Sequence, residues 1–85
     1  MTLYWFRTVP EKVKVRLTVN RRGNIELEPL QRVPNPEGPG VIGSIEYTDI
    51  EFAIRKLGRQ TVTKLLETQE PVITEVDRDI FLPEE

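Results

Sequence analysis

The stretch KVKVRLTVNRRGNIELEP, residues 12–29, decides the fold of this chain. Its first eight residues alternate between polar and apolar side chains, which is typical of a β-strand with one buried face. The apolar side chains share that face: Val13, Val15, Leu17 and Val19. The next four residues, 20–23 (NRRG), predict a tight turn, because Asn favours the first position of a type I turn and Gly accepts the left-handed conformation that closes a bulged loop. The stretch therefore predicts a β-hairpin.

The predicted turn also fixes the register of the hairpin. It sets four cross-strand pairs: Asn20–Asn24, Val19–Ile25, Leu17–Leu27 and Arg16–Glu28. This register places every apolar side chain on one face, whereas a slip by one residue would set Val19 against Glu26. The turn and the apolar pattern thus agree on one pairing.

The segment before the hairpin predicts a further strand. Residues Thr2 to Val9 (TLYWFRTV) are rich in aromatic and β-branched side chains, which favour strands, and Pro10 ends the segment. The pattern leaves open whether Tyr4, Trp5 and Phe6 belong to the core or to the surface.

Residues 33–44 (VPNPEGPGVIGS) predict a loop, because they contain three prolines and three glycines. A loop of about a dozen residues is long for a compact domain and is a candidate functional or mobile segment. Its letters G-x-G-x-x-G at 38–43 lack the preceding strand and the following helix that phosphate binding requires, so we do not expect a nucleotide site there.

The second half of the chain predicts two helices and a last strand. Thr48 and Glu51 fit a capping box, and Gly58 separates two apolar stripes with helical spacing. The stripes comprise Ile50, Ala53, Ile54 and Leu57, and then Val62, Leu65 and Leu66. Residues 72–82 alternate again and predict a strand, with or without an interruption.

Together these elements predict a single α+β domain over residues 1–85. The expected architecture is a small, mostly antiparallel sheet of three or four strands packed against two short helices, in the order βββααβ. The longest apolar run is four residues, from Leu3 to Phe6, so we expect no membrane segment. The absence of cysteine and of a signal-peptide pattern favours the cytoplasm.

The composition argues against catalysis. The chain has no histidine and no cysteine, and Ser44 is its single serine, so the usual nucleophile–base pairs are absent. We expect no enzyme activity, no cofactor and no metal site. Glu75, Asp77 and Asp79 alternate like calcium ligands but lack the glycine of a calcium loop, so we expect them to face the basic residues of the hairpin across the sheet.

Charge is divided unevenly along the chain, and this division points to binding. Residues 1–32 carry seven basic and three acidic side chains, a net charge of +4, whereas residues 33–85 carry five basic and eleven acidic, a net charge of −6. The candidate partner-binding residues lie on one strand face and at the hairpin tip: Lys12, Lys14, Arg16, Arg21 and Arg22. The leading hypothesis is a small non-catalytic binding or adaptor protein that acts through protein–protein contacts, with pairing of sheet edges into a homodimer as a further option. The alternative is a nucleic-acid-binding regulatory domain that uses the basic hairpin at 12–28.

Overall fold

The computed structural model describes residues 2–83 and confirms the α+β class. A four-stranded antiparallel sheet has the strand order β3-β2-β1-β4. The elements from residue 12 onward have the order βββααβ, as predicted, but the third strand is β3 at residues 45–47, whereas the prediction counted Thr2–Val9 as the first strand. That segment is a helix. Their bounds are α1 (Thr2–Thr8), β1 (Lys12–Val19), β2 (Ile25–Pro29), β3 (Ile45–Tyr47), α2 (Ile50–Leu57), α3 (Arg59–Thr68), β4 (Val72–Asp77) and the 3-10 helix η1 (Arg78–Phe81).

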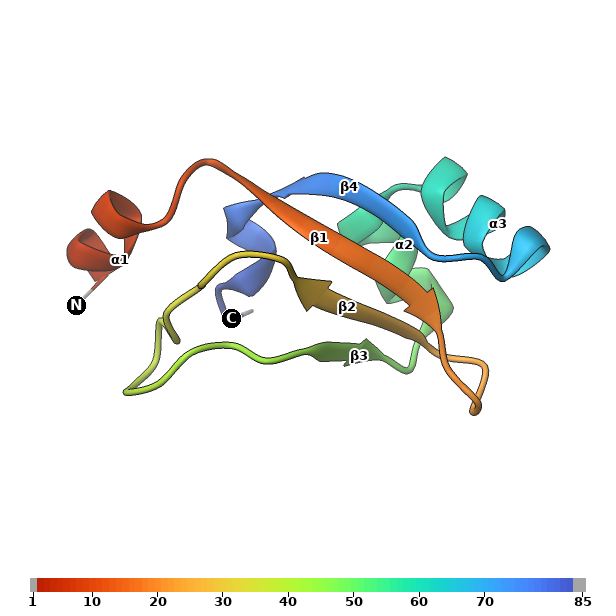
Figure 1. Cartoon of the computed structure of the whole chain (residues 1–85), viewed down its shortest axis with the longest axis horizontal. Coiled ribbons are helices and arrows are strands. Elements are labelled where there is room, and N and C mark those ends of the chain that lie inside the picture. Colours follow the sequence, from red (N-terminus) through yellow and green to blue (C-terminus); the bar gives the residue numbers. More distant parts are fainter. Residues whose placement is uncertain (1, 84–85) are drawn as a thin grey trace.

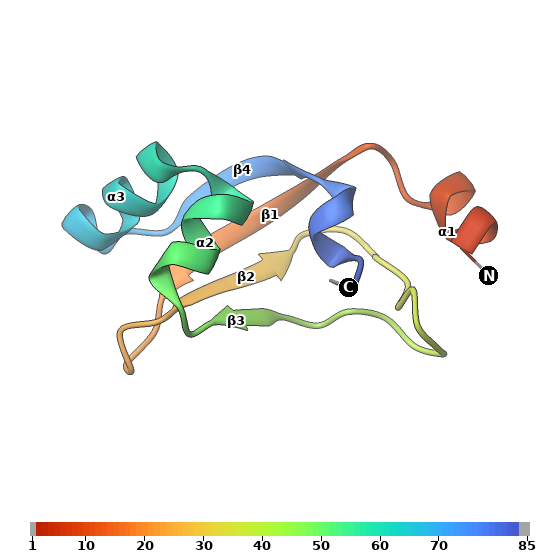
Figure 2. The same ribbon diagram turned by 180° about the vertical axis from the view of Figure 1, so that it is seen from behind.

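The sheet has one covered and one open face. Helices α2 and α3 lie behind the sheet in Figure 1 and in front of it in Figure 2, together with η1. The covered face carries the apolar side chains of β1, of which Val13, Val15 and Leu17 are fully buried and Val19 is partly buried. The polar side chains of β1 point to the open face, because successive residues of a strand alternate. No helix within residues 2–83 is long and apolar enough to cross a membrane.

The hairpin has the predicted register. Val19 lies opposite Ile25, Leu17 opposite Leu27, and the N–H of Asn20 donates to the carbonyl of Asn24 at 2.9 Å. Gly23 has φ +80°, a conformation that side chains with a Cβ rarely adopt. The side-chain Oδ1 of Asn20 accepts from the backbone N–H groups of Arg22 and Asn24, at 2.9 and 3.0 Å, so the turn is fixed from inside.

The predicted strand at Thr2–Val9 is wrong, because this segment forms α1. The reason is tertiary packing. Trp5 and Val9 are spaced by four residues, so they share one helix face, and both are 98% buried. The opposite face leaves Tyr4 71% exposed. Strand propensity is a weak preference that such burial overrides.

Arg78 of η1 holds the C-terminal end of α1 in place. Its Nη1 donates to the carbonyl oxygens of Phe6 and Val9 at 2.9 and 2.7 Å, and its guanidinium lies 4.7 Å from the ring centre of Phe6. These carbonyls have no partner within so short a helix, and a cation is favourable at a helix C-terminus. The helix is therefore anchored by a residue about seventy positions away in the sequence.

Residues 33–44 form a folded loop rather than an irregular one. Val33 is fully buried, and its carbonyl accepts from the N–H of Ile42 at 2.8 Å. Pro34 and Val41 form an antiparallel bridge, and the N–H of Asn35 donates to Gly40 at 3.0 Å. The loop thus turns back on itself and reaches toward α1 (Figure 1).

The second half of the chain confirms the two helices that meet at Gly58, which has φ +93°. The predicted capping box of Thr48 and Glu51 is wrong, because Asp49 is the N-cap of α2 and its side chain accepts from the N–H of Glu51 at 2.9 Å. The last strand ends at Asp77, where the backbone turns into η1, so the predicted strand over 72–82 is confirmed for residues 72–77 and wrong for the rest.

Candidate functional site

The five cations singled out from the sequence do not form one free patch. Arg22 at the hairpin tip is tied to Glu46 of β3: its Nε donates to Oε2 at 3.0 Å and its Nη2 to Oε1 at 2.8 Å. A two-pronged contact of this kind is among the stronger polar interactions in proteins. Arg22 therefore serves mainly to fasten the turn to the neighbouring strand.

The three cations of β1 face acidic or apolar side chains across the sheet. Lys12 donates to the Oδ1 of Asp77 at 2.6 Å, and this contact raises the pKa of Lys12. Lys14 lies opposite Glu75, which confirms the predicted acidic partners on β4 for these two lysines. Arg16 lies between Glu28 on one side and Ile73 on the other, and Asp79 lies outside the sheet in η1. At the hairpin tip, Arg21 forms no ion pair with any of residues 2–83. Two of the five cations are thus held in ion pairs within the fold, and Lys14 and Arg16 each have a glutamate opposite them across the sheet.

Glu46 is the centre of a polar cluster at this end of the sheet. Besides Arg22, the side-chain amides of Asn20 and Asn24 donate to its Oε2 at 2.7 and 2.8 Å. These hydrogen bonds, that of Arg22 foremost, hold the pKa of Glu46 at about 2, below its ordinary value of 4.5. The cluster joins the hairpin turn to β3.

This cluster predicts an acid-sensitive contribution to stability. Because the pKa of Glu46 is lower in the folded chain than in the unfolded one, the contribution is complete above pH 4.5 and is lost as the pH falls toward 2. We expect Glu46→Gln to flatten the decrease in the free energy of unfolding over this range, measured by urea unfolding at a series of pH values. Glu28→Gln, on the same open face, is the matched control and should retain the decrease. Equal curves for the parent and Glu46→Gln would contradict the prediction.

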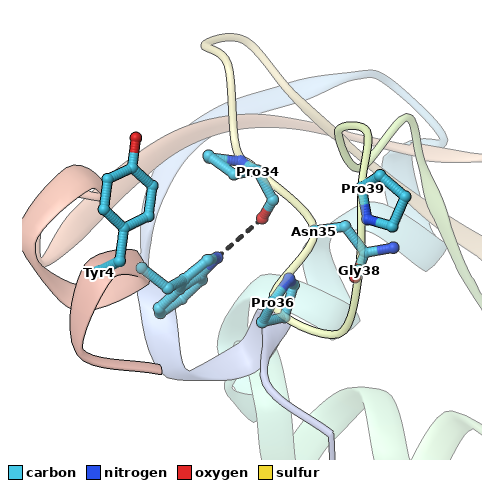
Figure 3. Close-up of a pocket in the computed structure, with 7 residues that line it drawn as sticks. Tyr4, Pro34, Asn35, Pro36, Gly38 and Pro39 are labelled. Atoms are coloured by element: carbon cyan, nitrogen blue, oxygen red, sulfur yellow. Dashed lines mark hydrogen bonds between the residues drawn. The ribbon is translucent and has the colours of Figure 1, made fainter. Parts of the chain in front are cut away.

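A cavity of about 430 Å³ lies between α1 and the loop at 33–44, and we call it the Trp5 pocket. Figure 3 shows Tyr4 of α1 on one side and Pro36 and Pro39 of the loop on the other. Seven residues line it: Tyr4, Trp5, Pro34, Asn35, Pro36, Gly38 and Pro39. Its volume lies within the range of about 300–1,000 Å³ that is typical of ligand sites.

The polar groups of the Trp5 pocket are largely engaged with each other. The indole Nε1 of Trp5 donates to the carbonyl of Pro34 at 2.7 Å, drawn as a dashed line in Figure 3. The Oδ1 of Asn35 accepts from the N–H of Glu37 at 2.9 Å. None of the seven lining residues carries an ionised side chain at neutral pH. The pocket therefore suits an uncharged, apolar group and offers nothing that would hold an anion or a metal ion.

A second cavity, beside β3, is less suited to binding. A cavity of about 340 Å³ lies beside β3 and Phe52, and its Tyr47 is 95% buried with a hydroxyl that has no hydrogen-bond partner among residues 2–83. Burial raises the pKa of Tyr47 to about 12.

No three acidic side chains converge as metal ligands anywhere in the part of the chain that the structure describes.

The sequence draws attention to both segments that line the Trp5 pocket but does not predict that they lie next to each other. The aromatic run at 4–6 and the proline loop at 33–44 were each singled out, yet some thirty residues separate them. The spacing of Trp5 and Val9 by one helical turn was the available signal that the first wall is a helix. Comparison with protein-family models, with curated proteins and with solved structures gives no match to this chain.

Proposed function

We propose that this chain is a small, non-catalytic binding module that acts through protein–protein contacts, and that the Trp5 pocket receives an uncharged ring, aromatic or proline, from the partner. The observation that carries this proposal is the pocket itself, with its apolar walls and its internally engaged polar groups. Aromatic and proline rings pack against exposed aromatic side chains, and grooves lined in this way receive such rings in other binding domains. In this pocket the exposed ring is that of Tyr4, whereas Trp5 is 98% buried beside it. A sequence without histidine or cysteine supports a binding role over a catalytic one.

The structure gives less support to the nucleic-acid alternative. Arg22 and Lys12 are each held by a carboxylate at 2.8 Å or less, and Glu26 and Glu28 share the open face with the basic strand. Phosphate binding requires cations that are free to displace counterions. Within residues 2–83, three hairpin cations form no ion pair, namely Lys14, Arg16 and Arg21, and two glutamates share the strands with them.

The proposal is tested by following Trp5, which is the single tryptophan of the chain. The chain is titrated with short neutral peptides that contain proline or phenylalanine, and with a glycine–serine peptide, while the Trp5 indole N–H resonance is recorded. We expect the ring-containing peptides to shift this resonance and the glycine–serine peptide to leave it unchanged.

Tyr4→Ala should weaken this binding by about fivefold, because a stacked aromatic contact is worth about 1 kcal/mol. Tyr4 is largely exposed, so its removal should leave the fold intact. Leu66→Ala, an exposed apolar position on α3, is the matched control and should bind like the parent. If no peptide shifts Trp5, or if both variants lose binding equally, the proposed site is wrong.

A further inference from the structure

Strand β4 is a free edge of the sheet. It pairs with β1 on one side and has no strand on the other, and its six residues make it twice as long as β3 at the opposite edge. Figures 1 and 2 both show β4 as the outermost strand. An edge of this length can accept an additional strand through its backbone.

The register shows which backbone groups of β4 point outward. In an antiparallel sheet the N–H and C=O of one residue point to the same side, and the side alternates along the strand. The N–H of Arg78 donates to Glu11 at 2.9 Å, so Arg78 faces β1 and Asp77 faces away. The same alternation turns Glu75 and Ile73 away from β1 as well.

A contact on the far side of β1 supports this assignment. The carbonyl of Lys14 accepts from the N–H of Leu30 at 2.8 Å, so the backbone of Lys14 faces β2 and is not bonded to its opposite residue, Glu75. Among residues 2–83, no backbone hydrogen bond is formed by the outward groups of Ile73, Glu75 or Asp77. Three consecutive outward positions are therefore ready to pair.

The side chains of these three residues lie on the open face and define the chemistry of the edge. Ile73 is 62% exposed, and Glu75 and Asp77 are acidic. Asp77 is bonded to Lys12, whereas the carboxylate of Glu75 has no ion pair within the described residues. The edge thus combines free backbone groups with an unpaired negative charge.

The occupied side of β4 shows which strand suits this acidic row. There β4 pairs with β1, whose sequence KVKV sets Lys12 against Asp77 and Lys14 against Glu75. A strand added on the free edge would meet the same side chains of β4 on the open face as β1 does on the other side. A segment with lysine or arginine at alternate positions, and apolar residues between them, would therefore complement the edge in charge and in pattern.

We propose that the free edge of β4 binds an extended segment of a partner protein in which basic residues alternate with apolar ones, and that this segment pairs antiparallel with Ile73, Glu75 and Asp77. This surface is separate from the Trp5 pocket, so the two proposals stand or fall independently. A second copy of the chain is a poorer occupant through this edge. Strand β4 carries two acidic residues and no basic one, so pairing two copies of β4 never gives Glu75 a cation.

The test uses the synthetic peptide Ac-KVKVKVK-NH2 and its acidic counterpart Ac-EVEVEVE-NH2, titrated into the full chain and followed by amide resonances. We expect the basic peptide to shift and protect the amides of Ile73, Glu75 and Asp77, and the acidic peptide to have no effect. A basic peptide that is N-methylated at its lysines keeps its charge but loses the N–H donors that would face β4. Its failure to bind would show that strand pairing, and not charge alone, holds the segment.

Two matched charge reversals separate the edge from the rest of the open face. Glu75→Lys should weaken binding of the basic peptide by about tenfold, because it replaces an attractive cross-strand pair with a repulsive one. Glu28→Lys makes the same change on β2, away from the edge, and should leave the affinity within about twofold. Glu75→Gln, a milder change, should give an intermediate loss and guards against misfolding of the lysine variant.

Several results would overturn the proposal. These are equal binding of the basic and acidic peptides, equal binding of the N-methylated peptide, an equal loss in Glu28→Lys, or absence of shifts at the three edge amides. Sedimentation of the chain as a dimer whose edge amides are already protected would instead assign the edge to a second copy.

Discussion

Replacing Leu17 with alanine should lower the free energy of unfolding by about 2–5 kcal/mol, which is the range for truncating a large apolar side chain in a core. Leu17 is fully buried and sits in the central part of the sheet, opposite Leu27 on β2 and Val72 on β4. Its removal leaves a cavity between β1, its two neighbouring strands and the helices, and these elements can relax only partly to fill it. Small domains are stable by only about 5–15 kcal/mol, so this single change would remove a large share. Urea unfolding measures the loss.

The control for this prediction is the next residue along the strand. Arg16 points to the open face, so Arg16→Ala should change the free energy of unfolding by about 0.5 kcal/mol or less. The two variants together test the register, because a shift by one residue would exchange their positions. Equal losses would mean that the alternation along β1 is not as described.

Replacing Arg78 with alanine should cost about 2–3 kcal/mol and release α1. The change removes two charge-assisted hydrogen bonds, to Phe6 and Val9, and the contact between the guanidinium and the Phe6 ring. The carbonyls at the end of α1 would then lack their partner. Urea unfolding gives the total cost, and hydrogen exchange of the Val9 amide, which donates to Trp5 at 2.9 Å, reports on the helix alone.

Two further variants make this experiment specific. Arg78→Lys keeps the charge and the capacity to donate to the carbonyls, but it loses the planar guanidinium that lies against the Phe6 ring, so its effect should be intermediate. Arg59→Ala removes an exposed arginine from the start of α3 and should be nearly neutral. Unchanged exchange at Val9 in Arg78→Ala would show that α1 does not depend on this anchor. Since α1 carries Tyr4 and Trp5, Arg78→Ala should also weaken peptide binding in the Trp5 pocket.

The hairpin was predictable because three local signals agree at residues 12–29. The alternation of apolar side chains, the turn residues and the position of Gly23 all select one register, and the structure has that register. The break between α2 and α3 was likewise visible at Gly58. In each case the residues that decide the structure lie within a few positions of one another.

The N-terminal helix was not predictable by the same means, because its partners are distant in sequence. Trp5 donates to Pro34, and Arg78 reaches back to Phe6 and Val9. Local propensity at Thr2–Val9 favours a strand, and only these long-range contacts reverse the preference. The Trp5 pocket was missed for the same reason, since neither of its walls indicates the other.

The basic hairpin shows a different limit. Sequence alone places five cations on one ribbon, but it does not say which carboxylates face them. The structure sets Asp77 against Lys12 and Glu46 against Arg22, so the apparent patch is partly an internal pairing of the two oppositely charged halves of the chain. The prediction that acidic residues of the last strand face the lysines is confirmed by the register of β1 and β4.

The position of β1 between β2 and β4 governs how the chain can fold during synthesis. Lys12 pairs with Asp77, so the central strand receives one neighbour early and the other only when the last strand has left the ribosome. The chain must lose the entropy of closing the loop between β1 and β4 before the contacts between these strands form. This order of events slows folding relative to helical proteins of equal size. Until β4 is in place, the valines and the leucine of β1 are packed against one neighbouring strand instead of two. A nascent chain of this protein therefore depends on the synthesis of β4, and termination before residue 72 would leave the apolar face of β1 without this neighbour.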